Sequence, residues 1–168
     1  MNGAMVCKGK FEVTCRDRVG DVKWIERMPN MVVNVGLQHI LNVTFSGSTQ
    51  SATWYVGLSG SSPTVASGDT VATHAGWDEF TAYDEATRQE WVEVRTNQSM
   101  TNSGTKATFT VSTDSSIIGG AFLATDSTKG GSTGTLMCSA AFTGGNKSAD
   151  DNDSIEVQYT FTAGDDGA

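Results

Sequence analysis

Polar and apolar residues alternate in segments near both ends of the chain. Residues 10–15 and 22–26 alternate with a period of two on either side of the turn-forming residues 17–21. This period is typical of strands buried on one face, so we predict a β-hairpin. Residues 154–162 repeat the pattern, and one side of that strand is formed by Ile155, Val157, Tyr159 and Phe161.

A helical period replaces the alternation between Asn34 and Phe45. The apolar residues that recur there at helical spacing are Val35, Leu37, Ile40, Leu41 and Phe45. We therefore predict one helix, with Asn34 as its N-cap and Ser46-Gly47 at its end, packed against a sheet.

The rest of the chain has the pattern of short strands and turns. Residues 52–58 form a nearly continuous apolar run suited to a central strand, and 59–85 is the longest irregular stretch. Further strands are expected at 90–95, 105–112, 117–125, 133–143 and 154–162, separated by clusters of Ser, Gly, Asp and Asn. This spacing predicts an all-β protein: a β-sandwich of about eight strands with one packed α-helix.

No change in composition marks a domain boundary within the 168 residues. We predict a flexible N-terminal arm over 1–9, a single β domain over 10–163 and an acidic tail over 164–168. A chain of this length buries roughly two thirds of its unfolded surface, enough for a core without metal or disulfides. No stretch approaches 18 apolar residues, so we expect neither a signal peptide nor a membrane span.

The charge balance is acidic, with 11 Lys and Arg against 19 Asp and Glu and a formal net charge of −8. A nucleic-acid site needs clustered basic residues, and the only local excess is near the start, at Lys8, Lys10, Arg16, Arg18 and Lys23. We therefore expect neither nucleic acid nor membrane as a partner. The basic start and acidic end are either solvated surface or a means for copies to meet head to tail.

Catalytic and metal-binding motifs are not found in the sequence. It has no HExxH, CxxC, Gly-x-Ser-x-Gly or P-loop pattern, and its two histidines, His39 and His74, are far apart. The oxygen-rich segment 150–156 lacks the order of a calcium loop, which favours an acidic loop before a strand. We expect no enzyme activity, no cofactor and no metal, and we expect reduced thiols at Cys7, Cys15 and Cys138.

Residues 77–91 form the densest aromatic segment of the chain. Three interpretations remain open: packing at the end of the sandwich with Arg88 paired to Asp84 or Glu85, a protein interface, or stacking on sugars. The candidate partner contacts are residues of this segment and two basic residues near the start of the chain: Lys8, Lys10, Trp77, Tyr83, Arg88 and Trp91.

Several segments, taken as an ordered set, resemble a small structural (virion) protein of tailed bacteriophages. The segments are 31–45 (MVVNVGLQHILNVTF), 54–58 (WYVGL), 68–70 with 74–77 (GDT, HAGW), 83–88, 118–123 (IGGAFL) and 129–131. The resemblance extends from about residue 10 to 163. It implies a head decoration (cement) protein or a tail- or fibre-associated component, and it carries over no functional residues.

Together, the resemblance and the residues predict a non-catalytic virion structural protein made in the host cytoplasm. The first expectation is a capsid decoration protein that binds the lattice of the major capsid protein and forms a homo-oligomer. A tail or fibre-attachment component that contacts other virion proteins is the first alternative. The second alternative is a carbohydrate-binding module for host glycans.

Overall fold

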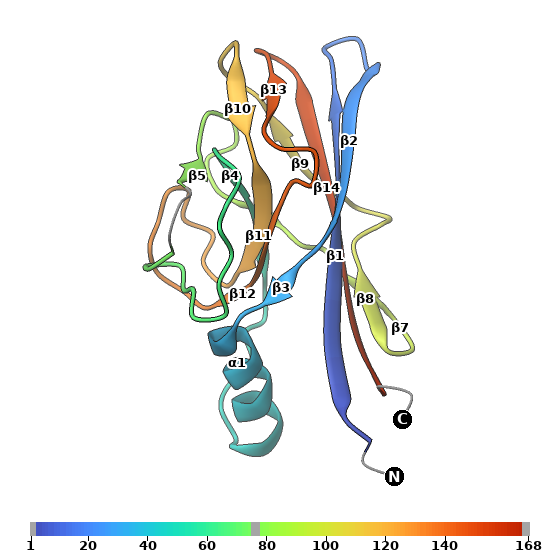
Figure 1. Cartoon of the computed structure of the whole chain (residues 1–168), viewed down its shortest axis with the longest axis vertical. Helices are drawn as coiled ribbons and strands as arrows, with labels where there is room; N and C mark the ends of the chain where they lie inside the picture. The colour runs from blue at the N-terminus through green and yellow to red at the C-terminus, as the bar shows by residue number, and fades with distance from the viewer. Residues whose placement is uncertain (1–2, 75–77, 166–168) are drawn as a thin grey trace.

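Two antiparallel sheets packed face to face make up most of the computed structural model, which describes residues 3–74 and 78–165 (Figure 1). The long sheet has the order β2 (Val22–Pro29), β1 (Met5–Arg16), β14 (Ser154–Asp165), β8 (Ser99–Thr101) and β7 (Val94–Thr96), and β9 (Ala107–Thr110) also pairs with β14. The short sheet has the order β3 (Met31–Val32), β12 (Leu136–Ala141), β11 (Gly120–Ala124), β4 (Tyr55–Ser59) and β5 (Glu79–Phe80), and β6 (Gln89–Glu90) also pairs with β4. A separate pair is formed by β10 (Ser116–Ile118) and β13 (Lys147–Ala149). The all-β fold with a single helix over the described residues confirms the predicted class.

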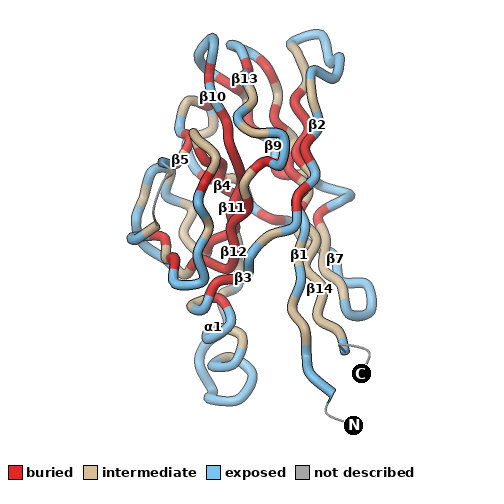
Figure 2. Tube along the Cα trace, viewed as in Figure 1, coloured by how far each residue is buried: buried red, intermediate tan, exposed pale blue. Residues whose placement is uncertain are grey.

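The hydrophobic core lies between the two sheets (Figure 2). The long sheet contributes alternate residues of its central strands, including Phe11, Val13, Val157 and Tyr159, each at most 1% exposed. The short sheet contributes residues that are buried along whole strands, as in β4 and β11. The alternation predicted for the last strand is confirmed, because Ile155, Val157 and Tyr159 are buried while their neighbours are partly exposed.

The first and last strands pair along their whole length. The register runs from Met5 opposite Asp165 to Arg16 opposite Ser154, twelve residues on each strand. Residues 5–9 are therefore part of β1, and Gly164 and Asp165 are part of β14, where the sequence predicted an arm and a tail. The apolar alternation fades there because the inward positions are taken by Cys7 and Gly9, and backbone pairing with the distant strand extends the ladder beyond it.

The helix α1 (Asn34–Phe45) lies where it was predicted, but it begins differently. Its N-cap is Val33, without a side-chain cap, so the prediction of Asn34 as N-cap was wrong. Val33 is fully buried and its backbone nitrogen donates to Met137 O over 3.1 Å, so the link to β12 determines where the helix starts. Gly36 lets the helix backbone approach that strand, because a Cβ there would lie 2.6 Å from Met137 O.

Only part of the predicted apolar face of α1 packs against the protein. Val35 and Ile40 are half-buried, whereas Leu37, Leu41 and Phe45 are exposed. The predicted face included both sets because helical spacing alone does not say where a neighbouring strand lies.

The structure divides the chain into more strands than the eight expected. Fourteen are assigned among the described residues, and eight of these have four residues or fewer. The predicted strand at 117–125 is split at Gly119, whose backbone packs directly against Ser61 and Ser62. The predicted central strand at 52–58 is observed as β4, inside the short sheet. No helix among the described residues is long and apolar enough to cross a bilayer.

The close packing of α1 on β12 predicts an unusual effect of a helix-favouring substitution. Gly36→Ala should gain roughly 1 kcal/mol of helix propensity. The new methyl group must displace the backbone at Met137, and overpacking of this kind costs about 1–3 kcal/mol. We expect a net decrease in the free energy of unfolding, measured by urea denaturation. Gln38→Ala, at an exposed position of the same helix, is the control and should be neutral or slightly stabilising. A Gly36→Ala protein more stable than wild type would contradict the packing.

Candidate functional site

The outward face of the long sheet brings together polar side chains from distant parts of the chain. The register places Lys10 of β1 opposite Thr160 of β14 and Pro29 of β2, and it places Glu12 opposite Gln158 and Arg27. Side chains of a strand alternate between its faces, so the partners of these outward positions also point to solvent. Lys8 and Lys10, two of the predicted contact residues, are exposed on this outward face.

Positive charge is concentrated on this outward face. Its charged residues are five basic ones, Lys8, Lys10, Arg16, Arg27 and Lys106, and three acidic ones, Glu12, Glu85 and Glu156. The face thus has a formal charge of +2, and the remaining 6 basic and 16 acidic residues of the chain sum to −10. The acidic residues are already engaged, Glu12 by Arg27 at 2.7 Å, Glu156 by Arg16 at 3.3 Å and Lys106 at 3.4 Å, and Glu85 by the Thr110 hydroxyl at 3.0 Å. Among described residues, no carboxylate lies within ion-pair distance of Lys8 or Lys10, so these two ammonium groups carry the unbalanced charge.

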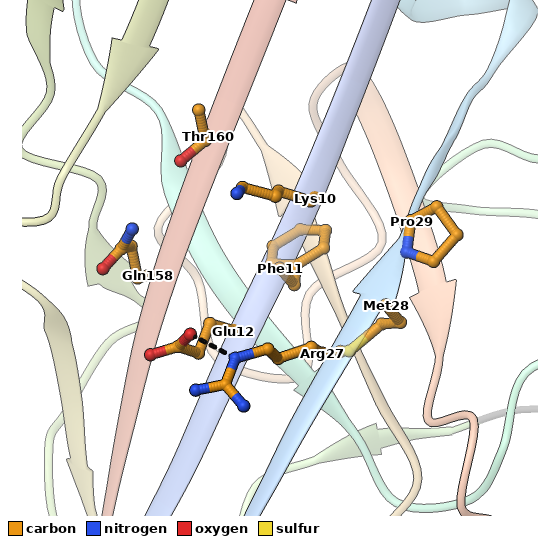
Figure 3. Close-up of a pocket in the computed structure, with 8 residues that line it drawn as sticks. All are labelled: Lys10, Phe11, Glu12, Arg27, Met28, Pro29, Gln158 and Thr160. Atoms are coloured by element: carbon orange, nitrogen blue, oxygen red, sulfur yellow. Dashed lines mark hydrogen bonds and ion pairs between the residues drawn. The ribbon is translucent and has the colours of Figure 1, made fainter.

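A shallow depression lies in the middle of this outward face (Figure 3). The side chains drawn around it come from the three strands β2, β1 and β14, and the Glu12–Arg27 pair spans two of them. Lys10 and Thr160 lie on neighbouring strands above that pair, and Gln158 lies beside Glu12. Ammonium, hydroxyl and amide groups in this arrangement can bind carboxylates and main-chain carbonyls of another protein.

Hydroxyl pairs extend the polar surface toward β8. Thr101 is hydrogen-bonded to Thr160 and Ser99 to Thr162, each over 3.0 Å between side-chain oxygens. Cross-strand pairs of this type hold side chains close to the sheet. The sequence analysis missed these residues and Gln158 as candidate contacts. The sequence did mark these residues as the polar positions of alternating strands. Only the pairing of the strands in the sheet shows that these positions form one surface.

Arg88 is a buried structural residue, not a surface contact. It is 1% exposed, and its Nε and Nη2 donate to the two carboxylate oxygens of Glu79 over 2.9 and 2.6 Å. Nη1 and Nη2 also donate to the backbone oxygens of Asp126 and Gly131 over 2.8 and 2.7 Å. The partner is thus Glu79, not the Asp84 or Glu85 expected from the sequence. Closeness in sequence did not predict the partner, because Arg88 turns inward to contact β5 and the backbone of two other loops.

Tyr83 and Trp91 are also buried, at 2% and 5% exposure. Lys129 lies 4.3 Å from the Tyr83 ring centroid and donates to the Tyr83 backbone oxygen, and burial raises the pKa of the phenol. Trp91 packs on Tyr159 and donates through Nε1 to its backbone oxygen over 3.1 Å. These positions match the packing interpretation of the aromatic segment, because both rings are buried and the Trp91 indole nitrogen bonds inside the protein. Trp77 lies outside the described residues.

The cysteines are free thiols in apolar or crowded surroundings. Burial raises the pKa of Cys15 and of Cys138 to about 12, and it also raises the pKa of Cys7, which keeps all three thiols protonated near neutral pH. His39 packs edge-on against Trp54, with ring centroids 5.3 Å apart. This contact is possible because His39 lies on α1 beside the apolar position Ile40. Within 3–74 and 78–165, no group of three or more His, Cys, Asp or Glu side chains is placed to hold a metal.

Three further carboxylates hold loops to the long sheet. Lys23 Nζ lies 2.8 Å from Asp150 Oδ2 and 2.6 Å from Asp153 Oδ2, which fixes the acidic loop before β14. Glu26, 6% exposed, pairs with Lys147 at 3.0 Å and accepts from Thr143 Oγ1 and Gly144 N. Burial opposes its ionisation, but the bonds from Lys147, Gly144 and Thr143 outweigh that effect and lower the pKa of Glu26. The acidic loop is thus held to β2 by Lys23, which pairs with both Asp150 and Asp153.

No family model, curated protein or solved structure matches this chain at a significant level.

The Arg88–Glu79 pair predicts a large loss of stability when one partner is removed. Arg88→Met leaves the Glu79 carboxylate buried without its guanidinium, which should lower the free energy of unfolding by about 3–5 kcal/mol. Arg95→Met, at an exposed position of β7, should change it by less than about 0.5 kcal/mol. Adding Glu79→Leu to Arg88→Met should recover part of the loss, because the unpaired charge is then absent. Equal stability of Arg88→Met and wild type in denaturant titrations would refute the structural role.

Glu26 predicts a specific dependence of stability on acid. Its pKa in the folded protein is below the unfolded value of about 4.3, so the stabilisation is complete above that value and is lost as the pH falls through the folded pKa. The stability difference between wild type and Glu26→Gln should therefore shrink from pH 6 to pH 3 in denaturation curves. Lys147→Met, which removes a main cause of the shift, should show a weaker dependence than wild type. A difference that stays constant over this range would contradict the assignment.

Proposed function

We propose that this protein is a non-catalytic virion structural protein that decorates a bacteriophage capsid, with the outward face of the long sheet docking on the major capsid protein. The observation that carries the proposal is the charge of that face, +2 on a chain whose remaining residues sum to −10. Such a distribution favours one orientation toward an acidic partner surface and disfavours the others. The ordered resemblance to small phage structural proteins supports the same function.

The shape and chemistry of the face suit repeated docking. Most of its side chains come from strands of one continuous sheet, so their spacing is set by backbone pairing. Hydroxyl groups are paired close to the sheet, and Lys8 and Lys10 remain available for a partner. A decoration protein needs only modest affinity per copy, because a lattice presents the same site many times.

The two alternatives have less support. A sugar-binding module needs exposed aromatic rings, and Trp91 is buried with its indole nitrogen already bonded. The resemblance to small phage structural proteins applies equally to a tail or fibre component. Such a component differs from a capsid decoration protein in its location on the particle, not in any feature of the sheet.

Charge reversal on the outward face tests the proposal. Lys8→Glu/Lys10→Glu changes the face by four charge units at exposed positions, so folding should be unaffected. We expect binding to purified capsids lacking the protein to weaken at least about tenfold at 0.15 M salt, measured by co-sedimentation. The matched control, Arg18→Glu/Arg95→Glu, makes the same charge change at exposed positions off this face and should bind nearly as wild type.

Two outcomes would reject the proposed role. If wild-type protein does not add to capsids at many copies per particle, decoration is excluded. If particles lacking the protein have normal heads but adsorb poorly, the tail alternative is favoured. Equal weakening by both double variants would remove the outward face as the docking surface, even if the protein binds capsids.

A further inference from the structure

A long uncharged segment surrounds α1. Residues 28–68 contain no Asp, Glu, Lys or Arg, although 30 such residues occur in the chain. The segment includes the whole helix and the exposed residues that follow it, 46–50. In a protein with a net charge of −8, contact between two copies is opposed by like charge over most of the surface. The uncharged end around α1 is a place where copies can meet without that cost.

One side of α1 carries an apolar stripe that its own chain leaves uncovered. Leu37, Leu41 and Phe45 follow one another at a spacing of four and are 38%, 49% and 79% exposed. The opposite side of the helix faces the protein, through Gly36 against β12 and through Ile40 and Val43. We call the three exposed residues the wedge.

The side of α1 opposite the wedge borders an apolar cleft. The β1–β14 ribbon continues past the short sheet, and α1 lies across from its free part (Figure 1). Between them is a cleft of about 290 Å³, whose apolar lining includes Ile40, Val43, Trp54, Met100 and Phe161. Of these, Trp54, Met100 and Phe161 are half-buried only, and Glu93 is the one acidic residue in the lining. The volume is at the lower limit of about 300 Å³ for small-molecule sites and suits a few apolar side chains.

We propose that the wedge of one copy packs into the cleft of a second copy. Wedge and cleft lie on opposite sides of one helix, so a chain cannot join its own two surfaces. Each copy therefore presents both halves of a contact, and repetition of this head-to-tail contact closes into a ring when the rotation allows it. Both halves are apolar and nearly free of charge, which matches them to each other better than to the acidic remainder of the surface.

The oligomeric state of the full chain tests this contact. We expect wild type to form an oligomer of defined mass in sedimentation velocity runs over a range of concentrations. Leu41→Glu/Phe45→Glu places two charges in the wedge at exposed positions and should raise the dissociation constant at least about thirtyfold. Val19→Glu is the matched control, since Val19 is 77% exposed in the turn between β1 and β2, at the far end of the molecule from α1 (Figure 1).

A second variant tests the cleft separately. Ala52→Glu introduces a charge at an exposed position of the cleft lining without altering the core, and it should dissociate the oligomer as the wedge variant does. Circular dichroism of each variant should match wild type. A wild-type monomer at all concentrations would overturn the proposal and leave the wedge to another protein. Wedge or cleft variants that keep the wild-type mass would overturn it as well, and so would a Val19→Glu protein that dissociates equally.

This contact does not depend on capsid binding. The wedge and the outward face of the long sheet share no residue, so loss of one should leave the other measurable. A wedge variant that is monomeric but still adds to capsids would separate the two proposals.

Discussion

The backbone pairing of β1 with β14 is the constraint on which the rest of the structure depends. Twelve residues from the start of the chain pair with twelve from its end, and every other strand of the long sheet attaches directly or indirectly to this ribbon. Its inward side chains contribute to the core Phe11, Val13, Cys15, Ile155, Val157 and Tyr159. Its outward side chains form much of the basic face. The most distant parts of the sequence therefore determine both the stability of the sandwich and the surface proposed to dock on a capsid. Folding must close this loop of nearly the whole chain, which is entropically costly and becomes favourable only when the core is buried.

Buried ion pairs have a structural role in this protein. Arg88–Glu79 and Lys23–Asp153 each join a loop to a strand, and Lys147–Glu26 joins β13 to β2. Each carboxylate is nearly inaccessible to water. Such pairs recover little net energy compared with apolar residues, because desolvation offsets their attraction. Their value here is positional: Arg88 bonds to three segments at once, and few other side chains could satisfy the backbone oxygens of Asp126 and Gly131.

The two proposed contact surfaces differ in physical character. The outward face of the long sheet is polar and basic, and its contacts should weaken as salt screens them. The wedge and cleft at the other surface are apolar and should be little affected by salt. A protein with both can associate with itself and with a differently charged partner without competition between the two contacts, as the assembly of a decorated lattice requires.

The sequence by itself determined the fold class and the kind of residue on each face, because strand and helix periods follow from local geometry. Alternation identified the hairpin and the inward side of the last strand, helical spacing identified the range of α1, and the spacing of turn residues identified the sandwich. Only the tertiary structure decided that residues 5–9 extend β1, because their pairing partner lies about 150 residues away. It also decided that Arg88 bonds to Glu79, that Tyr83 and Trp91 face inward, and that Leu37, Leu41 and Phe45 face outward. In each case the side chain is of a type that occurs both in protein interiors and on protein surfaces. Its environment is formed by strands and loops remote in sequence, and the local pattern contains no information about them.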